Sequence, residues 1–281
     1  MQPGWLWRAC KATQGSADSS GIELAHLIGR RRSHAEDQYI EPVLLTRLLD
    51  AAAAAPSLCA VCHGWGERRV CQPCVARFAP LLNRCSRCGL EVPAGTTVCG
   101  ECLVQPPPFE RTLAAVDYAH PWDGLITQFK FHAALDLAPA LAQQLLEAHG
   151  ASTALPPPSM LLPIPLSPAR LRERGYNQAW ELTRRIARVL QLRADAALLR
   201  RVKDTPHQLT LAPDQRAGNV RAAFAVEPLR RRELQGTTVA LVDDVMTTGA
   251  TAAEAARTLL AAGAAQVQVW VVARTPRSDA N

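Results

Sequence analysis

Apolar positions in the second half of the chain follow two alternating patterns. Short apolar and β-branched runs, typical of buried strands, occur at 113–118, 161–165, 237–242 and 267–273. Longer stretches with helical character lie between them, at 125–132, 136–149, from 168 onward and at 250–262. Because strands that alternate with helices form βαβ units, we expect an α/β domain with a mainly parallel sheet flanked by helices.

The first part of the chain has a different organisation. Residues 1–42 mix Gly, Ser, Gln and charges without any periodicity, so we expect disorder there. Residues 43–55 predict a short lead-in helix, which Pro56 ends. Three prolines at 106–108 form a stiff spacer after a cysteine-rich segment. The predicted parts are therefore a disordered extension at 1–42, the helix and cysteine module at 43–108, and the α/β domain at 109–281.

The composition suits a protein with a buried core, since 48% of the residues are apolar and 20% are charged. No apolar run approaches the roughly 18 residues that a membrane span needs, so we expect no membrane insertion. The N-terminus shows no secretory signal, and we therefore expect a cytoplasmic protein. The net charge of +6 is compatible with a phosphate-rich ligand or with nucleic acid and does not choose between them.

Eight of the nine cysteines form four CxxC pairs within one segment. In a reducing compartment such crowding favours metal ligands over disulfides. Two pairs complete a tetrahedral thiolate shell that suits Zn²⁺, so we predict two structural zinc ions. Sequential pairing closes the shortest loops and is preferred to a crossed arrangement. The predicted ligands are Cys59, Cys62, Cys71, Cys74, Cys85, Cys88, Cys99 and Cys102.

Iron–sulfur ligation and redox-active CxxC pairs are the alternatives for this segment. The regular pairing and the lack of a C-x₂-C-x₂-C-x₃-C run in the sequence favour zinc over both. The segment holds too few large apolar residues to fold unaided, so metal binding should supply much of its folding free energy.

A candidate phosphate site lies at residues 241–251, which read Leu-Val-Asp-Asp-Val-Met-Thr-Thr-Gly-Ala-Thr, follow a strand and open a helix. Gly249 allows close approach of the backbone, and the helix start presents free N–H groups and its positive dipole end to an anion. Asp243 and Asp244 can accept hydrogen bonds from vicinal hydroxyls, so the segment predicts a ribose 5-phosphate site. An ordinary strand, turn and capped helix is the alternative. The hydroxyl donors are Thr247, Thr248 and Thr251.

A second basic cluster follows the strand that ends near residue 165. The next helix carries Arg170, Arg172 and Arg174, and arginine offers rigid donor forks suited to phosphate. Arg174, directly before Gly175, is the better ligand candidate. Arg170 and Arg172 fit a solvated helix face equally well.

Residues 242–251 resemble the phosphoribosyl pyrophosphate (PRPP) binding motif of type I phosphoribosyltransferases. Together with Phe129-Lys130-Phe131-His132, the 174–178 stretch, the cysteine module and the segment 208–224, they resemble the ComF family of competence proteins and its relative GntX. The likeness covers roughly residues 57–275. It implies a type I phosphoribosyltransferase-like fold behind an N-terminal double zinc ribbon.

The resemblance also implies roles for individual residues. Asp243 and Asp244 would hold the ribose hydroxyls, and Mg²⁺ would accompany the pyrophosphate. Lys130 and the stretch 174–178, with Arg174 and Asn177 as its substrate-binding residues, match positions facing the pyrophosphate, and 208–219 matches a mobile loop over it. The implied 5′-phosphate ligands are Thr247, Thr248, Gly249 and Thr251, and the implied catalytic residues are Asp243, Asp244 and Arg174.

Two functions are compatible with these features. The first is a ComF-family protein that binds PRPP or ribose 5-phosphate and acts in DNA uptake, with single-stranded DNA and other competence proteins as partners. The second is an active phosphoribosyltransferase that releases pyrophosphate and acts on an unidentified acceptor. Arginines between 170 and 232 could contact DNA phosphates, although aromatic residues for base stacking are sparse among them.

Overall fold

A computed structural model describes residues 57–152, 157–203 and 222–277 of this protein. The predicted disorder at 1–42, the predicted lead-in helix at 43–55 and the predicted mobile loop at 208–219 lie outside the described residues. The same holds for His207, which precedes that loop in the sequence.

A five-stranded sheet forms the centre of the described chain, and all its neighbouring strands are parallel. Its strand order is β3-β9-β8-β4-β5. The two long central strands, β8 and β9, are paired along their length, so that Val242 lies opposite Trp270. The predicted α/β architecture with a mainly parallel sheet is therefore confirmed. The strands are β3 (Arg111–Asp117), β4 (Met160–Pro163), β5 (Arg193–Ala194), β8 (Thr238–Met246) and β9 (Gln266–Arg274).

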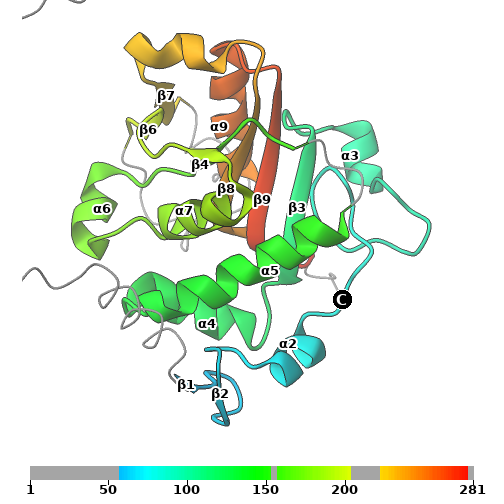
Figure 1. Cartoon of the computed structure of the whole chain (residues 1–281). Helices are drawn as coiled ribbons and strands as arrows, with labels where there is room; N and C mark the ends of the chain where they lie inside the picture. The colour runs from blue at the N-terminus through cyan, green and yellow to red at the C-terminus, as the bar shows by residue number, and fades with distance from the viewer. Residues whose placement is uncertain (1–56, 153–156, 204–221, 278–281) are drawn as a thin grey trace, which may run out of the picture. The chain divides into compact units, whose positions relative to one another are not determined.

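Helices cover both faces of this sheet (Figure 1). On one face α4 (Trp122–Phe131), α5 (Ala138–Ala151) and α7 (Gln178–Leu190) pack against alternate strand residues such as Ala240 and Val242. On the other face α9 (Ala250–Ala261) packs against Val239 and Leu241. Since successive strand residues point to opposite faces, the continuous apolar run of β8 supplies both halves of the core.

The single long helix expected from residue 168 is two helices, α6 (Pro168–Arg174) and α7. Gly175 ends α6 in the left-handed region, with φ +81°, and the Asn177 side chain caps the start of α7. A left-handed glycine followed by an Asn cap is a stop signal and a start signal in succession. The chain therefore changes direction between Arg174 and Gln178.

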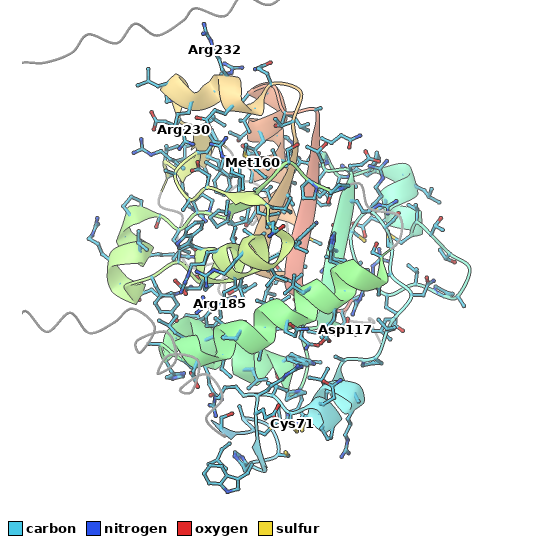
Figure 2. All side chains as sticks on the ribbon, in the orientation of Figure 1. Cys71, Asp117, Met160, Arg185, Arg230 and Arg232 are labelled. Atoms are coloured by element: carbon cyan, nitrogen blue, oxygen red, sulfur yellow. The ribbon has the colours of Figure 1, made fainter. Side chains whose placement is uncertain are left out.

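The cysteine-rich segment contains two short strands and two short helices, and each helix begins directly after a cysteine. Trp122 donates from Nε1 to the carbonyl of Phe78 at 2.7 Å, which holds α2 on α4. Arg84 forms an ion pair with Asp117 at the end of β3 at 2.8 Å (Figure 2). The described residues all belong to one compact unit. The elements of the segment are β1 (Ser57–Leu58), β2 (Trp65–Gly66), α2 (Gln72–Phe78) and α3 (Gly100–Val104).

Several short elements have no clear pattern in the sequence. A two-stranded antiparallel hairpin, β6 (Leu199–Arg201) with β7 (Phe224–Val226), packs beside α9. The 3₁₀ helices are η1 (Leu135–Leu137) and η3 (Pro228–Leu234). Within the described ranges, no helix has both the length and the apolar character needed to cross a membrane.

Gly89 generates a testable prediction about the cysteine-rich segment. It has φ +71°, and a Cβ placed there would lie 2.9 Å from Cγ2 of Thr112 on β3. Gly89→Ala should therefore lower the free energy of unfolding by about 1–2 kcal/mol for the left-handed backbone, and by about 1–3 kcal/mol more for the clash. Urea unfolding of the metal-loaded chain measures this change.

Gly95→Ala is the matched control, because Gly95 has φ +82° and a Cβ placed there would have no described atom within 4 Å. It should show the backbone cost alone. Equal losses of stability in the two variants would contradict close packing of the Gly89 turn against β3.

Candidate functional site

The eight predicted cysteine ligands lie in two groups of four. Their sulfur atoms lie within 4.8 Å of one another in each group. Each group joins a turn to the first residues of the following helix, α2 or α3. The sequential grouping expected from loop lengths is therefore present. The groups are Cys59, Cys62, Cys71 and Cys74, and Cys85, Cys88, Cys99 and Cys102.

The spacing of these sulfurs fits a tetrahedral metal ion. The Sγ atoms of Cys62 and Cys71 are 3.7 Å apart, and those of Cys88 and Cys99 are also 3.7 Å apart. Four thiolates at the usual zinc–sulfur distance of about 2.3 Å would be separated by about 3.8 Å. All eight of these described cysteines are free of disulfides. Both groups can therefore hold a metal ion without rearrangement of the turns.

The first cysteine of each group has a lowered pKa. Burial raises the pKa of the Cys59 thiol, but backbone N–H groups of Cys71 and the adjacent turn outweigh burial and bring it to about 6. Burial also raises the pKa of the Cys85 thiol, but backbone N–H groups, among them that of Cys99 at 3.3 Å, outweigh burial and bring it to about 7. N–H groups that point at sulfur stabilise the thiolate, which is the form that ligates metal.

The phosphate-loop motif has the local structure that its sequence predicts. Strand β8 runs through Asp243 and Asp244 to Met246, a turn follows, and α9 begins at Ala250. Gly249 occupies the N-cap of α9 with φ +80°, a conformation that favours glycine. Thr248 accepts from the N–H of Ala250 at 3.4 Å through its hydroxyl. The turn therefore presents the start of a helix at the carboxyl end of a central parallel strand, where ligands of α/β proteins bind.

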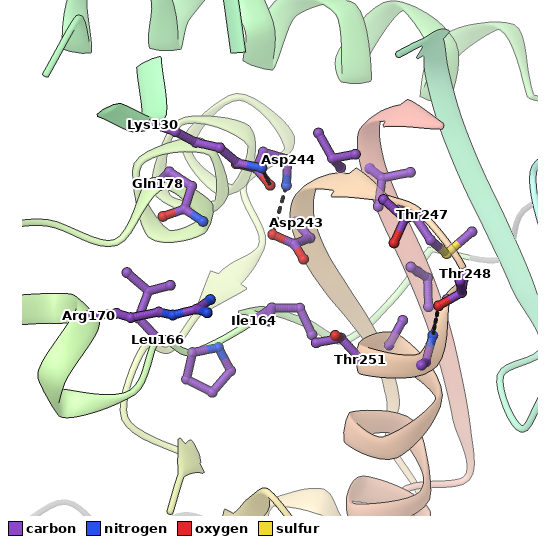
Figure 3. A pocket seen from close by; sticks show the side chains of 18 of the residues that line it. Lys130, Ile164, Leu166, Arg170, Gln178, Asp243, Asp244, Thr247, Thr248 and Thr251 are labelled. Carbon is purple, nitrogen blue, oxygen red and sulfur yellow. Dashed lines mark hydrogen bonds and ion pairs between the residues drawn. The ribbon is translucent and has the colours of Figure 1, made fainter. Parts of the chain in front are cut away.

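A cavity of about 310 Å³ opens at this edge of the sheet (Figure 3). It is lined from β8, the turn and the start of α9 on one side, and from α4, α6 and α7 on the other. The predicted site residues that line it are Lys130, Arg174, Asp243, Asp244, Thr247, Thr248, Gly249 and Thr251.

Asp244 is the most buried charged residue of this cavity, with 2% of its surface exposed. Its Oδ1 lies 3.1 Å from Nζ of Lys130 on α4. Its Oδ2 is buried and has no hydrogen-bond partner among the described residues. A buried carboxylate oxygen without a donor is costly, so this atom has strong capacity to accept a hydrogen bond from a ligand.

Asp243 has a pKa well above its ordinary value of 3.8. Burial is the largest cause, and repulsion from the Asp244 carboxylate adds to it, whereas Lys130 acts in the opposite direction. Oδ1 of Asp243 accepts from the N–H of Asp244 at 2.9 Å. Further hydrogen-bond donors or positive charge would therefore stabilise the ionised form of these two adjacent acids, which have Lys130 as their nearby cation.

Basic groups face the acid pair across the cavity. Arg174 donates from Nη1 to Oε1 of Gln178 at 2.5 Å, and its guanidinium lies 5.0 Å from the centre of the Phe131 ring. Arg170 also lines the cavity, which favours a binding role for it over a purely solvated one. Arg172 is exposed on α6 and does not line the cavity.

Asn177 caps a helix in addition to the binding role that the resemblance implies. Its Oδ1 accepts from the N–H groups of Ala179 and Trp180, and its Nδ2 donates to the carbonyl of Ile164 at 3.1 Å. Both ends of the amide are therefore used to cap α7 and to tie it to the end of β4. Asn177 is not among the residues that line the described cavity, and its contact with pyrophosphate stays a prediction.

Tyr118, which follows β3, and Arg201, which ends β6, line the cavity without a sequence motif that marks them. Gln178 also lines it, at the start of α7 and at the end of the 174–178 stretch that carries the resemblance. Gln178 is 5% exposed and holds Arg174, so it orients one of the predicted ligands. Only the tertiary structure brings these three residues together.

The raised pKa of Asp243 predicts a pH-dependent effect of Asp243→Asn. Below about pH 4 the carboxyl is protonated in both folded and unfolded chains, so the two proteins should differ least. As the pH rises above 3.8, the unfolded wild type gains more from ionisation than the folded chain. The variant should become progressively more stable than wild type until the pH passes the folded pKa.

Thermal unfolding of both proteins across this pH range measures the effect. Glu67→Gln, at an exposed carboxylate of the cysteine-rich segment, is the control and should show little such trend. A difference between Asp243→Asn and wild type that does not change with pH would contradict the raised pKa.

No family model matches the chain. Among solved structures it is similar to glutamine PRPP amidotransferase from B. subtilis, with 17% identity and a TM-score of 0.30, covering 49% of this chain and 25% of that one. It is also similar to a purine phosphoribosyltransferase from Pyrococcus horikoshii, with 16% identity and a TM-score of 0.26, covering 49% and 80%.

Sequence relatives match far more of the chain. It is 36% identical over 229 residues to DNA utilization protein YhgH of Salmonella typhi, covering 78% of this chain and 98% of that protein. It is equally identical to the protein of that name in Escherichia coli strain K12, over 226 residues. It is 35% identical over 193 residues to competence protein F of Haemophilus influenzae, covering 68% and 84%. The chain therefore belongs to the family of these proteins, the ComF family of competence and GntX-like proteins.

Proposed function

We propose that the cavity binds a 5-phosphoribosyl ligand, either PRPP or ribose 5-phosphate. The observation that carries the proposal is the buried Oδ2 of Asp244, which lacks a donor from the described chain beside a turn that opens a helix. A sugar phosphate has hydroxyl donors at one end and an anion at the other. It therefore complements the acid pair and the helix start at the same time.

Each part of the ligand has a proposed partner. Asp243 and Asp244 accept from the ribose 2′ and 3′ hydroxyls, and Lys130 and Arg174 compensate the charge of a pyrophosphate at C1′. Both cations line the same cavity as the acid pair. The proposed 5′-phosphate ligands are the hydroxyls and N–H groups of Thr247, Thr248, Gly249 and Thr251.

Mg²⁺ is the proposed companion of the pyrophosphate. Carboxylate oxygens are its preferred protein ligands, and Asp243 and Asp244 are the acids that line the described cavity. When bound, the ion would supply positive charge next to the leaving pyrophosphate.

Catalysis at this site would be phosphoribosyl transfer. A nucleophile forms a bond to C1′ of the ribose, the bond from C1′ to the pyrophosphate oxygen breaks, and pyrophosphate leaves with the electron pair. Arg174 and Lys130 would stabilise the growing charge on that oxygen, and Asp243 and Asp244 would fix the ribose. Transfer is the alternative to a site that binds its ligand without turnover.

The two cysteine groups are proposed to hold structural zinc. The sulfur spacing in the two groups of four supports Zn²⁺, which imposes no competing geometry. Since relatives carry the names DNA utilization protein and competence protein F, we propose that the protein acts in the uptake and use of DNA.

Direct contact with single-stranded DNA is a second candidate function, and it is better supported at the first cysteine group than along the arginine-rich stretch. Trp65 is 75% exposed, and His63 and Arg68 are exposed beside it in the same turn region. An exposed indole with nearby basic groups can stack on a base while the cation meets the backbone.

Most of the described arginines of the 170–232 stretch are engaged within the protein. Arg230 pairs with Asp195 and with Glu233 on η3 (Figure 2). Arg231 donates to carbonyls at the end of α9, and Arg185 pairs with Glu181 at 2.6 Å. Arginines whose donors are already used contribute little to phosphate binding, so the described part of this stretch is a weaker DNA surface than its charge suggests.

The ligand proposal predicts that the wild-type chain binds ribose 5-phosphate, and PRPP with Mg²⁺, in isothermal titration. Asp243→Asn combined with Asp244→Asn should weaken binding by at least about 150-fold, because two charge-assisted hydrogen bonds contribute about 1.5–3 kcal/mol each. Glu147→Gln, at an exposed glutamate on α5, is the matched control and should bind as wild type does.

Pyrophosphate release from PRPP in the presence of nucleobases or amines then separates the two functions of the site. Turnover supports the transferase, and binding without turnover supports a binding module. Unchanged affinity in the double variant would remove the acid pair from the proposed site.

The DNA proposal predicts that Trp65→Ala weakens binding of a labelled single-stranded oligonucleotide by roughly 5- to 150-fold, the equivalent of about 1–3 kcal/mol of base stacking. Binding should also weaken as salt increases. Fluorescence anisotropy measures both effects, and metal content should stay unchanged because Trp65 is exposed. Leu229→Ala removes another exposed apolar side chain, 94% exposed on η3, and should have no effect. Lack of binding by wild type at low salt would overturn the proposal.

A further inference from the structure

Arg274, the last residue of β9, links the second cysteine group to the phosphate turn. Its side chain is buried, with 6% of the residue exposed. Nε donates to the carbonyl of Cys88 at 2.8 Å. Nη1 donates to the carbonyls of Met246 at 3.0 Å and of Thr247. One guanidinium thus joins the turn that carries Cys88 to the last residue of β8 and the first residue of the turn that follows it.

The position of Arg274 on the sheet explains this reach. Arg274 pairs with Met246 in the β8–β9 register, so its backbone already lies beside the end of β8. The N–H of Thr275 also donates to the Met246 carbonyl at 3.0 Å. The rigid fork of arginine can serve several carbonyls at once, which a lysine cannot do with the same geometry.

The second cysteine group is fixed on the other side of this link. The N–H of Thr112 on β3 donates to the carbonyl of Ser86 at 2.9 Å, and the Thr112 hydroxyl donates to the carbonyl of Arg87 at 2.7 Å. Cys88 follows directly in the same turn. A metal ion held by Cys85, Cys88 and their partners would therefore set the position of the carbonyl that Arg274 binds.

The first cysteine group has different neighbours. Beside this group, the carbonyl of Phe78 accepts a hydrogen bond from Trp122 on α4, and Arg69 forms an ion pair with Asp136 of η1. These contacts do not include the phosphate turn, so the two groups differ in what they support.

We propose that Arg274 is a positioning residue that couples metal binding at Cys85, Cys88, Cys99 and Cys102 to ligand binding at the phosphate turn. Loss of the metal releases the Cys88 carbonyl, and the guanidinium then no longer fixes the carbonyls of Met246 and Thr247. Because each carbonyl shares a peptide plane with the next N–H, their position sets the direction of the N–H groups of Thr247 and Thr248 in the turn. The inference rests on the proposed binding of a 5-phosphoribosyl ligand.

Linkage makes the effect reciprocal. If metal strengthens ligand binding by a given factor, ligand strengthens metal binding by the same factor. Coupling between sites in proteins is typically about 5- to 150-fold, which is large enough to measure from either side.

Arg274→Met tests the link in the full chain loaded with zinc. The variant should keep two zinc ions per chain by mass spectrometry and bind ribose 5-phosphate at least about 5-fold more weakly than wild type. Arg277→Gln is the matched control. Arg277 belongs to the same segment and pairs with Glu101 of α3, but both side chains are largely exposed, so ligand affinity should not change.

Release of zinc from the wild-type chain to a chelating dye, titrated at equilibrium, is the second measurement, and it does not depend on the variant folding. Ribose 5-phosphate should raise the affinity for one of the two ions by about 5-fold or more and leave the other unchanged. In Arg274→Met, the ligand should raise the affinity for neither ion.

The outcomes separate this inference from the proposal on which it rests. Wild type that binds ribose 5-phosphate with no change in zinc affinity overturns the coupling alone, as does full ligand affinity in Arg274→Met. Wild type that does not bind the sugar phosphate overturns the proposed ligand and the coupling together.

Discussion

The structure of the candidate site depends on the electrostatics of two adjacent acids, one buried and one partly buried, at the end of one central strand. Asp244 is almost fully buried, and Lys130 is the cation that pairs with it. The pKa of Asp243 is raised because burial and the neighbouring carboxylate both disfavour its charge. This arrangement costs folding free energy, since burying a charge without enough partners is unfavourable. Such a cost is typical of a site where a ligand or ion completes the set of partners.

The parallel sheet makes this concentration of charge possible. The carboxyl ends of β8 and β4 meet at one edge, so side chains from distant parts of the sequence reach the same cavity. Rigid apolar packing on both faces, with α5 and α7 on one side and α9 on the other, holds these strand ends in place. The apolar core on both faces of the sheet therefore offsets the folding free energy that the charges of the site cost.

The sequence predicts well what depends on local pattern. The apolar runs of β8 and β9, the alanine-rich α9 and the CxxC spacing are local signals, and the structure bears out each of them. The single helix expected from residue 168 is wrong, although Gly175 and Asn177 carry a helix stop and a helix cap in the sequence. The capping role of Asn177 is a local signal as well, because an Asn that follows a helix-ending glycine favours the start of a new helix.

Contacts between distant residues could not be predicted from pattern. Nothing in the local sequence connects Lys130 with Asp244, or Arg274 with Cys88, because these pairs form only when β8, β9 and the cysteine turns are assembled. The link through Arg274 also changes the meaning of the cysteine-rich segment.

Structural zinc can supply about 10–16 kcal/mol of binding free energy, which helps to offset the entropic cost of ordering a segment with so small a core. The ion would fix the turn that carries the Cys88 carbonyl, and the buried guanidinium of Arg274 binds that carbonyl. Through this contact the metal would also restrain the turn between β8 and α9. The second metal group is therefore best understood as part of the frame of the phosphate site, even though none of its cysteines lines the cavity.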